Sequence, residues 1–173
     1  MKRPLPGPDP THACVDPDVG DLGHGFHLLR AVTVLDRPRD EVFPFFAAAQ
    51  NLERITPEAL RFRMLTPAPI RMRTGARIDY EIRLNGIPFR WRTEISVWDP
   101  PYGFTDTQIR GPYHTWAHRH LFENVGHGRT RMTDEVRYRL PGWPLGEVAL
   151  PFVRHQLRKI FEHRNRVIRE LLA

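Results

Sequence analysis

Alternation of apolar and polar positions is clearest over residues 77–84, whose apolar members are Ile78, Tyr80, Ile82 and Leu84. A period of two places these side chains on one face of a strand and the charged ones on the other. Asn85-Gly86 follows directly, and this dipeptide is typical of a tight hairpin turn. Residues 87–98 resume the alternation and place one set on a shared face: Phe89, Trp91, Thr93, Ile95 and Val97. The two segments therefore predict an antiparallel hairpin.

Further strands are predicted where apolar and β-branched residues lie between turn signals. These segments are residues 26–35, 61–65, 104–110, 114–124 and 129–140. The last three are joined by short connections, at Gly111-Pro112 and at residues 126–128, which favours antiparallel pairing. We therefore expect one antiparallel sheet of about six to seven strands.

A period of three to four residues replaces the alternation in two regions. Residues 38–49 carry an apolar stripe interrupted by Pro44, which is expected to bend the helix, and a second short helix is expected over residues 52–60. From about residue 145 to residue 172 the pattern predicts a long amphipathic helix, with Pro151 either kinking it or marking its start. A sheet with one apolar face and a helix with one apolar stripe must cover each other, so the order of elements predicts an α+β fold.

Residues 1–25 show neither period and are rich in proline and glycine. This composition is typical of a disordered arm, so a single domain is expected over residues 26–173. Four potential ligands in and beside the arm lack zinc-finger spacing, and no metal is expected there: His12, Cys14, His24 and His27.

Composition narrows the class of protein without giving a function. The chain has 173 residues, a net charge of +6 and one cysteine, which excludes an internal disulfide and suits a reducing cytoplasm. No apolar run approaches the roughly 20 residues of a transmembrane helix. Except for Lys2 and Lys159 the basic residues are arginine, and they alternate with apolar residues and with acids. This pattern favours a solvated outer face over a nucleic-acid or anionic-membrane surface, which stays as the weaker alternative.

The late strands place polar groups on the inner face. Arg119 is costly to bury, so the opposite parity of residues 114–122, with His118 and His120, is expected to point inward. By the same parity argument Asp134 lies among apolar neighbours, and Asp106 and Gln108 share a face with Phe104. Such groups either satisfy one another in a closed polar network or line a cavity that holds a ligand.

The predicted cavity has apolar and aromatic walls with a few polar anchors. Its candidate ligand-binding residues are Tyr80, Phe89, Trp91, Gln108, Trp116, His118, His120, Phe122, Met132, Asp134, Tyr138, Val153 and Leu157. Catalytic residues stay unassigned, and the candidates for acid–base work are His118, His120, Asp134 and Asp106. The His118-x-His120 pair invites a metal interpretation, but its distances from Gly111 and Glu123 do not match a cupin motif, so no metal and no cofactor are expected.

Four segments carry a family resemblance: PRDEVFPFFAAAQNLERITP, LNGIPFRWRTEISVWDPP, GPYHTWAHRHLFE and TRMTDEVRYRLP followed by the long helix. With them, residues 26–172 resemble the START-like superfamily called SRPBCC, in its polyketide cyclase/dehydrase and coenzyme-Q-binding-protein branch. The resemblance implies a helix-grip fold, in which a curved antiparallel sheet wraps around the C-terminal helix and encloses a hydrophobic cavity.

The resemblance also implies a function, binding of a lipid, quinone or polyketide-like molecule in that cavity without a cofactor. Relatives that are aromatase/cyclases steer ring closure or dehydration with polar cavity residues, so a cyclase or dehydratase is the alternative. Association with ribosomes or RNA is a weaker alternative, supported here only by the arginine-rich outer face. Monomer and homodimer both remain open.

Overall fold

One antiparallel sheet forms the body of the protein, in a computed structural model that describes residues 14–173. Its strands lie in the order β1-β2-β8-β7-β6-β5-β4-β3. Their bounds are Cys14–Gly23 (β1), Phe26–Leu35 (β2), Arg63–Met64 (β3), Arg77–Leu84 (β4), Ile87–Asp99 (β5), Gly103–Arg110 (β6), Thr115–Asn124 (β7) and Thr130–Arg139 (β8). The antiparallel pairing agrees with the short connections in the sequence.

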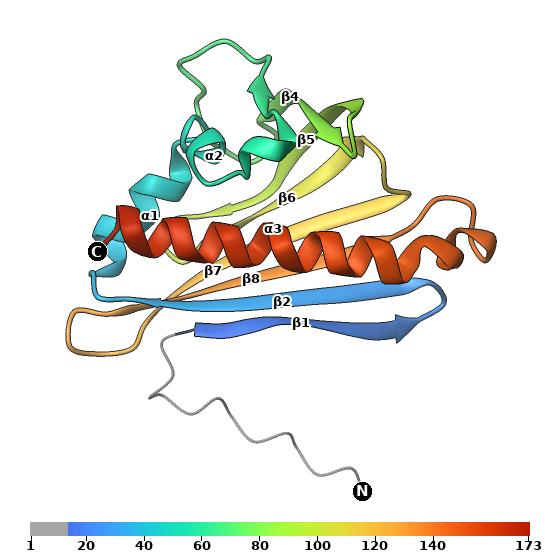
Figure 1. The fold of residues 1–173 in the computed structure, drawn as a ribbon. Coiled ribbons are helices and arrows are strands. Elements are labelled where there is room, and N and C mark those ends of the chain that lie inside the picture. The colour runs from blue at the N-terminus through green and yellow to red at the C-terminus, as the bar shows by residue number, and fades with distance from the viewer. Residues whose placement is uncertain (1–13) are drawn as a thin grey trace, which may run out of the picture.

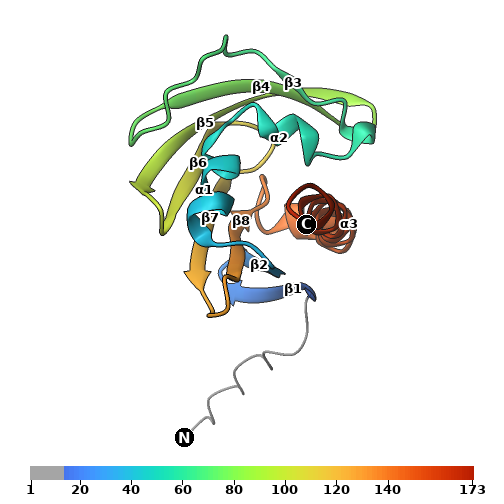
Figure 2. The ribbon, with the colours of Figure 1, turned by 90° about the vertical axis from the view of Figure 1, so that its left-hand side faces the viewer.

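Helices cover the concave face of this sheet. They are α1 (Arg39–Ala47), α2 (Asn51–Arg54), the 3₁₀ turns η1 (Glu58–Leu60) and η2 (Leu145–Ala149), and the long α3 (Leu150–Leu171). Figure 1 shows α3 running across the sheet, and Figure 2 shows the sheet curving around α3 seen end on. This is the helix-grip α+β arrangement that the sequence predicts.

The hairpin β4–β5 forms where the alternation predicts it. Leu84 pairs with Ile87 across the turn, and Asn85 and Gly86 both have positive φ, as a two-residue turn of this hand requires. Ile78, Tyr80 and Ile82 are buried, so the predicted inner face is the observed one.

The terminal helix buries the predicted apolar stripe. Leu157, Phe161 and Ile168 are buried and belong to the hydrophobic core that also contains residues of the sheet and of α1. Pro151 lies in the first turn of α3, where its missing N–H breaks no helical hydrogen bond, so it marks the start of the helix and does not kink it. Among residues 14–173, no helix is both long enough and apolar enough to cross a membrane.

Four expectations need correction. Residues 14–23 are not a disordered arm, because they form β1 and pair with β2, which brings the described sheet to eight strands; residues 1–13 lie outside the described part. Val97 is 51% exposed, because a register shift between Ile95 and Val97 turns it off the predicted inner face. The helix predicted over residues 38–49 ends at Ala47, and the one over 52–60 is two separate turns.

Candidate functional site

A cavity of about 180 Å³ lies between the inner face of the sheet, the segment from α1 to η1, and α3. Apolar and aromatic side chains form most of its wall, among them Phe46, Ile78, Tyr80, Trp91, Ile95, Trp116, Leu157 and Phe161. Polar side chains gather on the wall made by β5, β6, β7 and α3: Thr93, Asp106, His118, His120 and Arg164. The cavity therefore has the composition of a small-molecule site, largely apolar with a few converging polar groups.

Strand register places the polar groups together. On β7, His118 and His120 point to the inner face as two same-parity residues do. The pairing of β6 with β7 sets Asp106 opposite His118, and the pairing of β7 with β8 sets Asp134 opposite His120. Each imidazole thus lies between two carboxylates, one on each neighbouring strand.

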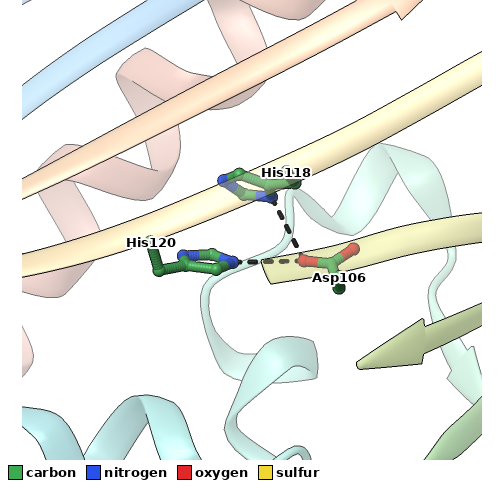
Figure 3. A group of neighbouring side chains, drawn as sticks. All are labelled: Asp106, His118 and His120. Carbon is green, nitrogen blue, oxygen red and sulfur yellow. Dashed lines mark hydrogen bonds and ion pairs between the residues drawn. The ribbon is translucent and has the colours of Figure 1, made fainter. Parts of the chain in front are cut away.

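The two histidines make different contacts with these carboxylates. His118 Nε2 lies 2.9 Å from Asp134 Oδ1, while its Nδ1 lies 3.7 Å from Asp106 Oδ2, beyond hydrogen-bond distance. His120 Nε2 hydrogen-bonds to Asp106 Oδ2 at 3.2 Å. Figure 3 shows both rings facing the Asp106 carboxylate. Thr93 also donates its hydroxyl to Asp106 Oδ1, at 3.1 Å, which holds the carboxylate in place.

Arg164 connects the long helix to this cluster. It is buried on α3 and its Nε donates to Asp134 Oδ2 at 3.3 Å. Since Asp106 and Asp134 together carry two negative charges and Arg164 one positive charge, one proton shared by the histidines would neutralise the cluster. A buried group of charges is stable only when it is paired in this way.

The pKa values follow from burial and from these contacts. Burial favours the neutral acid, but Arg164, the hydrogen bond to His118 and the nearby imidazole of His120 outweigh it and hold the pKa of Asp134 well below its ordinary value. Burial is likewise outweighed at Asp106, whose pKa is lowered by the two imidazoles. Burial and the charge of His120 lower the pKa of His118. Burial is outweighed at His120, where Asp106 and Asp134 raise the pKa. The shared proton therefore belongs on His120.

Acid is expected to destabilise the fold through these carboxylates. A carboxyl with a lowered folded-state pKa binds protons more readily in the unfolded chain, so its stabilisation is present above about pH 4 and is lost as the pH falls through the folded value. His120 acts in the opposite direction, because its raised pKa stabilises the folded protein when the imidazole is protonated. That stabilisation is lost as the pH rises above the unfolded pKa of about 6.5 and through the folded value, so it does not change the behaviour in acid. Urea unfolding at a series of pH values checks this. The free energy of unfolding should fall less steeply below about pH 4 in Asp106→Asn than in the parent protein.

If the free energy of unfolding falls equally steeply with decreasing pH in Asp106→Asn and in the parent protein, that expectation is contradicted. The lowered pKa of Asp106 would then have no consequence for folding.

The arrangement can do two kinds of chemistry. His118 and His120, each held by a carboxylate, can accept or donate a proton at a group in the cavity. One atom from each of Asp106, His118 and His120 also lies within 4.8 Å of the others, a spacing that suits ligands of one metal ion.

Some of the predicted ligand-binding residues lie at the cavity and others do not. Those at its wall are Tyr80, Trp91, Trp116, His118, His120 and Leu157, together with the acid–base candidate Asp106. Their contact with a ligand stays a prediction. Four others are buried behind the wall: Phe122, Met132, Asp134 and Tyr138. Gln108 donates its amide to the carbonyl of Tyr113, and Phe89 and Val153 are half-buried away from the wall.

Sequence reasoning missed Arg164, Tyr113 and Phe161 as cavity residues. The signal for Arg164 was its spacing, because positions 157, 161, 164 and 168 follow one helical stripe. An arginine on an otherwise apolar stripe indicates a buried carboxylate partner on the facing sheet. Tyr113 lies just before β7, where no period predicts the direction of its side chain.

Solved structures resemble this fold at low sequence identity. Protein Ms6760 from Mycobacterium smegmatis has a TM-score of 0.65 at 18% identity, covering 92% of this chain and 97% of that one. A START superfamily protein from the same organism has a TM-score of 0.65 at 10% identity, and the match covers 84% of this chain and 96% of that one. The ZhuI aromatase/cyclase from Streptomyces sp. R1128 has a TM-score of 0.60 at 11% identity, and the match covers 86% of this chain and 97% of that one. At these identities the likeness concerns the fold alone.

Sequence comparison assigns the family. No curated protein matches the chain. The family model described as polyketide cyclase / dehydrase and lipid transport matches residues 35–164, which span the region from the end of β2 to Arg164 on α3. The chain, with its curved sheet, gripped terminal helix and apolar cavity, therefore belongs to the polyketide cyclase/dehydrase and lipid transport family of SRPBCC-type proteins.

Proposed function

We propose that the protein binds an apolar small molecule of lipid, quinone or polyketide type in this cavity. The observation that carries the proposal is the asymmetry of the wall, which is mostly apolar and aromatic and carries its charged and imidazole side chains together, in the cluster of Asp106, His118, His120 and Arg164. Apolar burial supplies the binding energy, at about 25 cal/mol per Å² removed from water. The polar wall supplies a partner for one carbonyl or hydroxyl oxygen.

The size of the cavity supports a ligand with a ring-sized apolar group. Its volume of about 180 Å³ exceeds that of apolar cavities of about 150 Å³ that accept benzene. The aromatic walls Tyr80 and Trp91 stack with their ring centroids 5.8 Å apart, and Trp116 meets Trp91 edge to face. Aromatic rings and conjugated chains pack well against such faces.

A bulky residue at the wall is expected to abolish much of this binding. Ala48 is half-buried and lines the cavity, so Ala48→Trp places an indole in the ligand's space. With 2-naphthol as the probe and quenching of tryptophan fluorescence as the signal, the variant's affinity should fall at least about tenfold, equivalent to about 1.4 kcal/mol. Naphthalene, which lacks the hydroxyl, should bind the parent protein more weakly than 2-naphthol.

The matched control is Ala47→Trp. Ala47 is also half-buried, but it lies outside the cavity wall, so the same enlargement should leave the affinity for 2-naphthol nearly unchanged. Thermal unfolding of both variants checks that each is folded. Equal affinities of Ala48→Trp and the parent protein for 2-naphthol would end the proposal for this cavity.

Native mass spectrometry is an independent measurement, and it should show an apolar molecule retained by the purified protein.

A second candidate function is a cyclase or dehydratase that uses the same cavity. The observation that favours it is the pairing of His118 with the buried Asp134, which orients an imidazole whose other nitrogen faces Asp106 at the wall. An oriented imidazole of this kind can move a proton in an aldol or dehydration step. Turnover of a synthetic poly-β-ketone thioester by the parent protein distinguishes an enzyme from a binding protein.

The outer face of the sheet supports a solvated surface and not an RNA site. Several of its arginines pair with acids on neighbouring strands, as Arg92 does with Asp79 at 2.7 Å and Arg77 with Glu94 at 2.9 Å. Arginines already paired with carboxylates contribute little free positive charge for phosphates.

A further inference from the structure

We propose that Asp106, His118 and His120 form a binding site for a divalent first-row transition-metal ion at the polar wall of the cavity. The three side chains come from adjacent strands, β6 and β7, and each presents one ligand atom to a common point (Figure 3). Two imidazoles and one carboxylate are the donor set that proteins use for zinc and for non-haem iron with open coordination positions.

The spacing of the ligand atoms fits one ion. Asp106 Oδ2 lies 3.2 Å from His120 Nε2 and 3.7 Å from His118 Nδ1, and one potential ligand atom of each residue lies within 4.8 Å of the other two. Ligands at about 2.1 Å from a tetrahedral zinc ion are about 3.4 Å apart. The two separations from Asp106 Oδ2 bracket this value, so side-chain adjustments complete the site.

The groups behind the histidines are those expected around metal-bound imidazoles. A histidine that ligates through one nitrogen usually gives its other N–H to a carboxylate. Asp134 Oδ1 lies 2.9 Å from His118 Nε2 and 2.8 Å from His120 Nδ1, in each case the nitrogen away from Asp106. Arg164 in turn holds Asp134 Oδ2, which keeps that carboxylate ionised and fixed.

The same contacts leave a defect when the cluster is considered as a hydrogen-bonded network alone. His120 Nδ1 is buried and, among the described residues, has no hydrogen bond in good geometry, although Asp134 lies close. His118 Nδ1 lies too far from Asp106 for a hydrogen bond. A closed structural network would satisfy both nitrogens. An ion on Asp106, His118 Nδ1 and His120 Nε2 gives His118 Nδ1 the partner that it lacks and, by fixing the His120 ring through Nε2, directs His120 Nδ1 at Asp134.

The site opens toward the ligand space. Asp106, His118 and His120 all line the cavity, so a coordination position of the ion would face a molecule bound there. The ion would displace the proton that His120 carries in its absence and bring the cluster from neutral to a charge of +1, which suits a carbonyl, enolate or carboxylate oxygen. Only this use of the open position rests on the proposed function; binding of the ion rests on the protein side chains and is measured without any apolar ligand.

The test is a titration of tag-free, full-length protein stripped with EDTA. Calorimetry with ZnCl₂ should show one ion per chain, and Co²⁺ should give visible absorption bands typical of nitrogen and oxygen ligands. Asp106→Asn keeps the shape of the side chain, and His118→Ala removes one ligand. Each should weaken Zn²⁺ binding by more than the roughly 10–100-fold that loss of an outer-shell partner costs.

Two controls separate this site from other metal ligands. His114→Ala removes an exposed histidine just before β7, and the double variant His12→Ala/Cys14→Ser removes potential ligands near the start of the chain. Both should bind Zn²⁺ as the parent protein does. The proposal is overturned if the parent protein binds no ion, if Asp106→Asn and His118→Ala bind it unchanged, or if the double variant alone loses it. A rise in melting temperature with Zn²⁺ in the parent protein but not in Asp106→Asn confirms the site independently of calorimetry.

Discussion

Replacing Asp134 by alanine is expected to lower the free energy of unfolding by about 3–5 kcal/mol, measured by urea denaturation. Asp134 is 2% exposed and is the common partner of His118, His120 and Arg164. Without it the guanidinium of Arg164, itself 6% exposed, stays buried without a counter-charge. An uncompensated buried charge is far more costly than the loss of one favourable contact.

The chain contains a matched control for this prediction. Asp79 also pairs with an arginine, Arg92, through two hydrogen bonds of 2.7 and 3.0 Å, but both side chains are more than a third exposed. Asp79→Ala should therefore cost less than about 1 kcal/mol. The double variant Asp134→Leu/Arg164→Met should recover part of the stability lost in Asp134→Leu, because no buried charge is left unpaired. If Asp79→Ala and Asp134→Ala lose equal free energy of unfolding, burial of the ion pair does not determine the cost of removing its carboxylate.

The sequence predicts the direction of many side chains on the sheet, because side chains along a regular strand alternate between its two faces. The cost of burying Arg119 suffices to place His118 and His120 on the inner face, where the structure has them. The prediction fails at Val97, since a bulge shifts the parity by one and no residue type marks it beforehand.

Parity cannot distinguish a cavity wall from a packed core. Trp116 and Phe122 share the inner face of β7, but Trp116 lines the cavity and Phe122 is packed under α1. Phe43 and Phe46 of α1 lie with their rings 5.5 and 5.2 Å from that of Phe122. The boundary between the two regions depends on where the helices rest on the sheet, which is a tertiary property.

The long helix and its apolar contribution to the cavity, Leu157, are predicted by the period, but its polar contribution, Arg164, is not. The apolar residues of α3 predict which stripe is buried, and Arg164 falls on that stripe as its polar exception. Its partner Asp134 is 30 residues away on β8, so only the docking of α3 on the sheet brings the two charges together. The polar cluster thus fixes α3 over the cavity as well as lining it.

Shortening Phe161 to alanine is expected to cost about 3–5 kcal/mol of unfolding free energy and to enlarge the cavity. Phe161 is 4% exposed on α3, lines the cavity, and has its ring 5.5 Å from that of His118. Phe152 on the same helix is 54% exposed, so Phe152→Ala should change stability by no more than about 0.5 kcal/mol. Denaturant unfolding of both variants checks the difference.

The enlarged cavity makes the same variant a test of the space itself. A dry apolar void accepts an apolar guest, and a guest that binds only the folded state stabilises it. Naphthalene should therefore raise the melting temperature of Phe161→Ala more than that of the parent protein, while Phe152→Ala should respond as the parent does. If Phe161→Ala loses little stability and gains nothing from naphthalene, α3 does not close the cavity at this position. A large loss of unfolding free energy in Phe161→Ala, together with a large rise in its melting temperature on adding naphthalene, shows that the Phe161 ring closes the apolar ligand space on the α3 side, beside the histidines of the polar wall.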